Sequence, residues 1–116
     1  MKQVLIFHSD QPSIADLQSL LQDQCYIYAT TRRKMVLEFL KNNPVDFLII
    51  HLPSDFDKGI KHESQKLLKQ LRHRDLKKII ICSETEEERV KDFLKLGVTA
   101  IVGPGEALRV VLGVAK

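Results

Sequence analysis

Five short apolar runs alternate with five segments of helical spacing along this 116-residue chain. The runs are residues 4–7, 25–29, 47–50, 79–82 and 100–102. After each run, apolar residues recur every three or four positions, at residues 14–21, 35–40, 67–71, 90–94 and 108–115. A continuous apolar run favours a strand covered on both faces, and the wider spacing favours a helix with one buried side. The sequence therefore predicts a strand followed by a helix, five times.

This alternation predicts an α/β fold in which a parallel sheet lies between two layers of helices, because right-handed crossovers place helices on both faces. For five such units, the flavodoxin-like (βα)5 three-layer sandwich with strand order 2-1-3-4-5 is the common arrangement. The length suits one domain over residues 1–116, and no linker or low-complexity tract divides it. We expect a single domain. A domain of this size can stand alone or form the N-terminal part of a longer protein.

Residues that begin or end helices stand at the predicted boundaries. Pro12 suits the first turn of the first helix, and the Asn-Asn-Pro sequence at residues 42–44 ends the second. Ser83 and Glu86 have the spacing of a capping box at the start of the fourth helix, and Gly97 suits its end. The boundaries and the apolar pattern therefore agree.

Composition excludes several classes of protein. The net charge of +3 comes from interleaved basic and acidic residues, and the most basic stretch, residues 69–78, contains no aromatic residue, so we expect a solvated turn and no nucleic-acid partner. No apolar run approaches the roughly 18 residues of a membrane span, and the N-terminus lacks a secretory signal, so we expect a cytoplasmic domain. Cys25 and Cys82 lie in apolar stretches and are expected to be buried thiols.

Polar residues follow the first, third and fourth predicted strands. They are His8, Ser9, Asp10, His51 and Ser83. In an open parallel sheet the functional crevice lies at the carboxyl ends of the strands, beside the point where the strand order reverses. We therefore expect these side chains to share one rim of the sheet.

Three stretches give the chain a resemblance to a known family. "VLIFHSDQPSIADLQSLLQ", "NNPVDFLIIHLP" and "KKIIICSETEEERVKDFLKLGVTAIVGPGEALRVVL" resemble the receiver domain of two-component response regulators (CheY-like), over essentially the whole chain. The resemblance implies the same fold. It also aligns His51 with the family's phosphorylated aspartate, and His8 and Ser9 with the acidic pair that holds magnesium.

Other positions depart from the family pattern too. The lysine that precedes a proline after the fifth strand is replaced by Gly103, and the fifth-strand aromatic by Ile101, whereas Ser83 keeps the hydroxyl. Phosphoryl transfer depends on positioning and on neutralising charge, and magnesium prefers oxygen ligands. The resemblance therefore implies a degenerate pseudo-receiver without a phosphoacceptor aspartate, a magnesium site or a cofactor.

The function that follows is a non-catalytic signalling domain of a two-component or phosphorelay-related pathway. In the family, the surface of the fourth helix, fifth strand and fifth helix carries partner or dimer contacts, which implies a protein partner or self-association and no membrane. Here this surface would offer Arg89, Lys91, Asp92, Lys95, Ile101 and Arg109. Passive docking to a histidine kinase is a further possibility of the same kind.

Four chemical alternatives rest on individual residues. The first is a sensor in which His8 and His51 bind a small ligand, or a metal together with Asp10 or Asp55. The second is phosphorylation of His51 itself. A Ser-His-Asp hydrolase built from Ser83 or Ser9 with His51 and Asp10 lacks the Gly-x-Ser-x-Gly elbow. The stretch "GPGEA" resembles a dinucleotide fingerprint only weakly.

Overall fold

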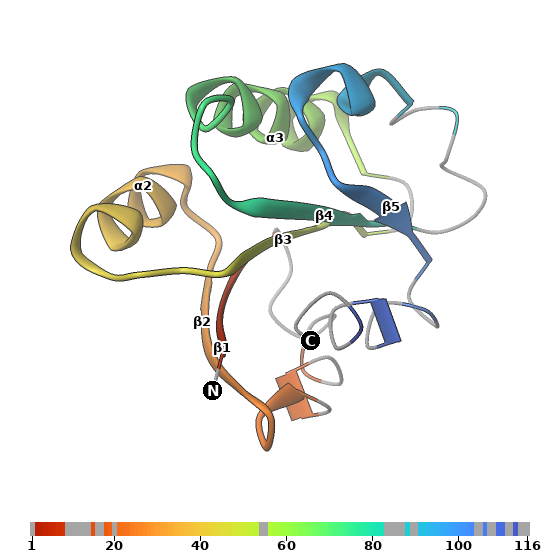
Figure 1. Ribbon diagram of the computed structural model, residues 1–116. Coiled ribbons are helices and arrows are strands. Elements are labelled where there is room, and N and C mark those ends of the chain that lie inside the picture. The colour runs from red at the N-terminus through yellow and green to blue at the C-terminus, as the bar shows by residue number, and fades with distance from the viewer. Residues whose placement is uncertain are drawn as a thin grey trace.

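The sheet is parallel and has five strands, in the order β2-β1-β3-β4-β5 (Figure 1). The computed structural model describes residues 2–8, 15, 18–19, 21–53, 56–82, 88, 91–103, 106, 109–110 and 113. The strands are β1 (Lys2–His8), β2 (Cys25–Thr30), β3 (Phe47–His51), β4 (Lys77–Ile81) and β5 (Ala100–Val102). The predicted order is confirmed. β1 lies between β2 and β3, so the switch point of the sheet, where strands begin to be added on the other side of β1, is between β1 and β3.

Two apolar clusters, one on each face of the sheet, form the core. Alternate residues of a strand point to opposite faces, so Leu5 and Phe7 belong to one cluster and Val4 and Ile6 to the other. The helices α2 (Arg33–Asn42) and α3 (Lys58–Gln70) cover the first face together with the 3-10 helix η2 (Lys91–Leu96). Helical residues 15–21 and 109–113, as far as they are described, lie across the other face in Figure 1. The predicted three layers are therefore present.

Hydrogen bonds fix the C-terminus of α2 and the N-terminus of α3. Asn43 caps the C-terminus of α2 through its backbone N–H, which donates to the Phe39 carbonyl, and the Arg74 guanidinium donates to the Leu40 carbonyl at 3.1 Å. Asp57 caps the N-terminus of α3, where its carboxylate accepts from the backbone N–H of Ile60 at 2.8 Å. The predicted end of α2 at residues 42–44 is confirmed. The caps predicted from Pro12, Ser83 and Glu86 lie outside the described residues.

The fourth helical segment differs from the prediction over residues 91–96, which wind as the 3-10 helix η2. In this winding residues three apart share a side, so Phe93 is buried and Leu96 packs against the same cluster. Leu94, predicted to face the core together with Phe93, is instead 53% exposed. Gly97 ends η2 with a φ of 86°, in the left-handed region that favours glycine.

The basic stretch at residues 69–78 is only partly the solvated turn that the sequence predicted. Its first residues complete α3, its last two begin β4, and Lys78 is just 3% exposed. The long aliphatic part of the side chain is buried, and its ammonium group donates to the Arg74 carbonyl at 3.4 Å. Burial lowers the pKa of Lys78, because desolvation disfavours the charged form.

We expect Lys78→Met to be as stable as the wild type at neutral pH, or more stable by up to about 1 kcal/mol, because a methionine avoids the cost of burying a charge. A lysine pKa that is lower in the folded state means that the unfolded chain binds the proton more tightly. The contribution of Lys78 to stability therefore rises with pH from its folded-state pKa to its ordinary value of 10.5. Urea unfolding between pH 7 and 10.5 should show a flatter pH dependence for the variant. A large loss of stability at pH 7 would contradict this account.

Both cysteines are buried, as predicted, and they lie in different core clusters: Cys25 on one face of the sheet and Cys82 on the other. Burial raises the pKa of the Cys25 thiol, which keeps it protonated. No helix among the described residues is both long enough and apolar enough to cross a membrane.

Candidate functional site

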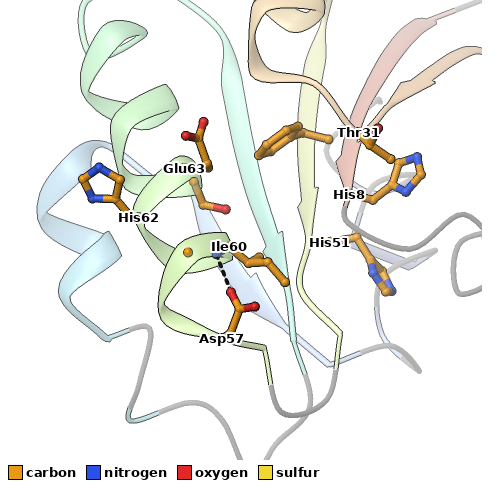
Figure 2. A pocket seen from close by; sticks show the side chains of 10 residues that line it. His8, Thr31, His51, Asp57, Ile60, His62 and Glu63 are labelled. Atoms are coloured by element: carbon orange, nitrogen blue, oxygen red, sulfur yellow. Dashed lines mark hydrogen bonds between the residues drawn. The ribbon is translucent and has the colours of Figure 1, made fainter.

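His8 and His51 lie side by side where β1 and β3 end. They are register partners in the parallel ladder, so their side chains point to the same face of the sheet, the one opposite to Phe7 and α3 (Figure 2). His8 is only 3% exposed, while His51 is partly exposed. Their adjacency follows from the strand order, because the two strands that flank the switch point end at the same edge. Two imidazoles therefore occupy the centre of the predicted rim.

Of the other predicted rim residues, the structure describes only Gly103. Gly103 follows Val102 of β5, whose register partner in β4 is Ile81, and Ile81 is in turn the partner of His51. Gly103 thus lies at the same edge of the sheet, two strands from His51, and its carbonyl accepts from the N–H of Glu106 at 3.1 Å. Ser9, Asp10 and Ser83 lie outside the described residues.

The described rim residues do not suit magnesium, which prefers oxygen ligands in octahedral geometry, because imidazoles stand at the ends of β1 and β3. Within the part of the chain that the structure describes, no group of three or more histidine, cysteine or acidic residues is placed to hold a metal ion. Asp10 and Asp55, the third ligands considered for a transition metal, are outside that part. The described residues therefore supply two imidazoles and no metal centre.

A pocket of about 390 Å³ opens beside the two histidines. Phe7 and His8 of β1, Thr31 after β2, and His51 form one side, and the first two turns of α3 form the other (Figure 2). Most of the lining surface is apolar. The sequence predicted a crevice with the histidines at this rim but not the wall contributed by α3, which depends on how far α3 stands from the sheet.

The wall contributed by α3 is held in place by polar contacts. The Asp57 carboxylate caps the helix, and the Glu63 carboxylate accepts from the guanidinium of Arg33 at 2.8 Å, which joins α3 to the start of α2. Arg33 also donates to the Gln70 side chain at 2.7 Å. The hydrogen bond from Arg33 lowers the pKa of Glu63, so this carboxylate is ionised at neutral pH.

Ser64 is the buried polar residue of this wall. It is fully buried, it lines the pocket, and its hydroxyl has no hydrogen-bond partner among the described residues. A buried hydroxyl without a partner has lost its hydrogen bonds to water and has gained nothing in return. Such a group gains a hydrogen bond if a ligand in the pocket reaches it.

The second candidate site is the surface around η2 and β5. A shallow hollow of about 280 Å³ there is lined by Glu88, Lys91, Leu94 and Ile101. Lys91 lies 3.7 Å from the Glu88 carboxylate, and both side chains are exposed. Leu94 adds a large exposed apolar side chain, which the helical spacing had assigned to the core.

The remaining residues predicted for this surface differ in their contacts. Asp92 faces α3, where it accepts from Gln65 at 3.0 Å and lies 3.6 Å from the Lys61 ammonium. Arg109 is exposed and lies 3.9 Å from the Glu106 carboxylate, and Lys95 is exposed as well. Arg89 is outside the described residues.

Comparison with known proteins relates the fold to solved structures. No protein-family model matches the sequence, and no curated protein sequence matches it significantly. Among solved structures, the chain is similar to the receiver domain of the TMAO respiratory system response regulator TorR, with 19% identity and a TM-score of 0.74, over 97% of this chain and 91% of that one.

Two further structures show the same likeness. A response regulator from Thermotoga maritima has 13% identity and a TM-score of 0.77, over 98% of this chain and 97% of that one. A response regulator receiver protein from Burkholderia phymatum has 16% identity and a TM-score of 0.74, over 98% and 94% of the two chains. Identities this low relate folds and not activities. The chain therefore has the fold of response regulator receiver domains.

Proposed function

We propose that this chain is a non-catalytic, receiver-like signalling domain that acts as a protein interaction module in a two-component or phosphorelay-related pathway. The observation that carries the proposal is the pairing of His8 with His51 at the ends of β1 and β3. The resemblance to receiver domains places carboxylates of the phosphorylation site at these two positions. A fold kept without those groups suits a docking role.

The proposal includes the loss of aspartyl phosphorylation. Transfer of a phosphoryl group relies on a positioned nucleophile, a metal ion and positive charge close to the transferred oxygens. Here His51 takes the place of the nucleophile, the neighbouring His8 is a poor ligand for magnesium, and Gly103 brings no positive charge. We accordingly propose no enzymatic activity, no cofactor and no nucleic-acid partner for this domain, and a cytoplasmic location.

The proposed docking face consists of Lys91, Leu94, Lys95, Ile101 and Arg109, together with Arg89. An exposed leucine at the edge of a hollow, surrounded by basic and acidic side chains, has the composition of a small protein interface with an apolar centre and a polar rim. Asp92 contributes less to this face, because its carboxylate already contacts Gln65 and Lys61. The occupant is a second copy of the chain or a partner protein such as a histidine kinase.

We expect Leu94→Glu to weaken self-association through the docking face by at least about tenfold, because it places a charge in the apolar centre of the interface. Sedimentation equilibrium over a range of protein concentrations gives the dimer dissociation constant. The substitution should leave the free energy of unfolding within about 0.5 kcal/mol of the wild type, since the side chain is exposed.

Tyr26→Glu is the matched control, because Tyr26 is a similarly exposed apolar side chain, at 60%, on the edge strand β2, at the opposite end of the sheet from β5. This control should associate like the wild type. A wild-type chain that stays monomeric, or equal weakening by both substitutions, would contradict docking of a second copy through this face.

A second candidate function is a sensor that uses the altered pocket around His8 and His51. The specific observation in its favour is that the space beside the two histidines is an open pocket of about 390 Å³. The described donor atoms favour a small organic ligand over a metal ion in this role. Sensing and docking are compatible, since the pocket and the docking face are lined by different residues.

A further inference from the structure

The pocket beside His8 and His51 has the size and surface of a site for a small organic molecule. Its volume of about 390 Å³ lies in the range of about 300–1,000 Å³ that is typical of ligand pockets. In Figure 2 the labelled side chains of α3 stand on one side, and His8, Thr31 and His51 on the other. Apolar atoms supply most of the lining, so burial of apolar ligand surface would drive binding.

The charges in the lining are already engaged within the protein. One oxygen of Asp57 accepts from the Ile60 N–H at 2.8 Å, and one oxygen of Glu63 accepts from Arg33 at 2.8 Å. An anionic ligand would meet these two carboxylates, and no lysine or arginine stands among the described lining residues. A cationic ligand would have to compete with the contacts that both carboxylates already make. The lining therefore favours a neutral ligand.

One aromatic ring and a buried hydroxyl narrow the class of ligand further. Phe7 points to the face of the sheet that α3 covers, and its ring would pack favourably against a ring of the ligand. The imidazoles of His8 and His51 point to the opposite face. The Ser64 hydroxyl, without a partner among the described residues, can donate or accept a hydrogen bond after rotation about a single bond. A ligand that reaches it would satisfy a group that the unliganded protein leaves without a hydrogen bond.

From these features we propose that the pocket binds a small, neutral ring compound that carries one hydrogen-bonding group, of the class of phenols and indoles. The ring lies between Phe7 and Ile60, and the polar group bonds to Ser64. This inference rests on the second candidate function, the sensor, and does not depend on the docking face. Binding would occupy the space between α3 and the sheet and would thereby bias the position of α3.

Titration of the ¹⁵N-labelled chain with four probes, followed by two-dimensional NMR, tests the proposal. Phenol and indole are the neutral probes, and benzoate and benzylammonium are charged rings of similar size. Phenol and indole should shift the amide signals of Phe7, Ile60 and Ser64 in a saturable way, with dissociation constants near about 1 mM, as expected for molecules with so few atoms. The charged probes should bind at least about tenfold more weakly.

Ser64→Ala tests the hydrogen bond to the ligand. Its melting temperature should equal or exceed that of the wild type, because the substitution removes a buried hydroxyl without a partner, while its affinity for phenol falls about fivefold. Gln65→Ala is the matched control, since Gln65 is the next residue of α3 and donates to Asp92 instead of lining the pocket. Its affinity for phenol should not change.

The possible failures are distinguishable. Tighter binding of benzoate or benzylammonium at the same amides would overturn the proposed ligand class and would leave the sensor function standing. No saturable shift of those amides by any of the four probes would overturn both the ligand class and the sensor function. Equal phenol affinity of Ser64→Ala and the wild type would overturn the role of Ser64. None of these results affects the docking face.

Discussion

Phe56→Ala is expected to lower the free energy of unfolding by about 3–5 kcal/mol, the usual cost of truncating a buried phenylalanine. Phe56 is 2% exposed and packs in the core cluster beneath α2, α3 and η2. It immediately precedes Asp57, the residue that caps α3. Because domains of this size are stable by only about 5–15 kcal/mol, the loss is a large fraction of the total. Urea unfolding followed by circular dichroism measures it.

Two controls separate the buried ring from its surroundings. Asp57→Ala removes only the helix cap and should cost about 1 kcal/mol. Leu94→Ala removes an exposed side chain and should change stability by less than about 0.5 kcal/mol. A loss for Phe56→Ala no greater than that for Asp57→Ala would show that the ring contributes little to the packing between α3 and the sheet.

The sequence predicted the sheet because strands and switch point follow from local patterns. Each apolar run became a strand, with boundaries that moved by no more than two residues, and β3 ends on His51 as expected. The proximity of His8 and His51 was also predictable, since parallel strands on either side of the switch point end at the same edge. These features require only the apolar pattern and the common strand order.

Features that depend on three-dimensional packing were not predictable in the same way. Leu94 has helical spacing relative to Val90, but the 3-10 winding of residues 91–96 turns it outwards. Lys78 looks like part of a solvated turn, yet its aliphatic stem is buried. The pocket arises from the separation of α3 and the sheet. The sequence did contain one signal for where α3 begins. Asp57 is a residue type that caps helix N-termini, and it stands directly before Lys58.

The combined variant His8→Asp/Ser9→Asp/His51→Asp/Gly103→Lys is expected to gain magnesium-dependent phosphorylation by acetyl phosphate, whereas the wild type stays unmodified. The receiver fold already places residue 8 beside residue 51 and residue 103 at the same edge of the sheet. If the backbone is kept and only the reacting side chains differ, restoring them should restore the chemistry. Intact-mass spectrometry should detect the addition of one phosphoryl group to the variant and none to the wild type.

The same variant should acquire stabilisation by magnesium. Residue 8 is 3% exposed in the wild type, so a carboxylate there loses hydration, and two more carboxylates nearby add repulsion. The metal-free variant should therefore be less stable than the wild type. Magnesium binds only the folded variant and should recover about 2.7 kcal/mol at a concentration 100 times its dissociation constant. Thermal unfolding with and without magnesium should show this effect for the variant alone.

The single substitution His51→Asp separates the nucleophile from the metal site. It supplies the aspartate but leaves His8 and Gly103, so neither magnesium nor positive charge would assist the transfer, and we expect no phosphorylation. Phosphorylation of this single variant, or of the wild type, would show that His8 and Gly103 do not prevent the reaction. No magnesium-dependent stabilisation of the combined variant would instead place the obstacle in the backbone at the ends of β1 and β3. Because His51→Asp carries one change and the combined variant carries four, the pair of results separates loss of the nucleophile from loss of its electrostatic support.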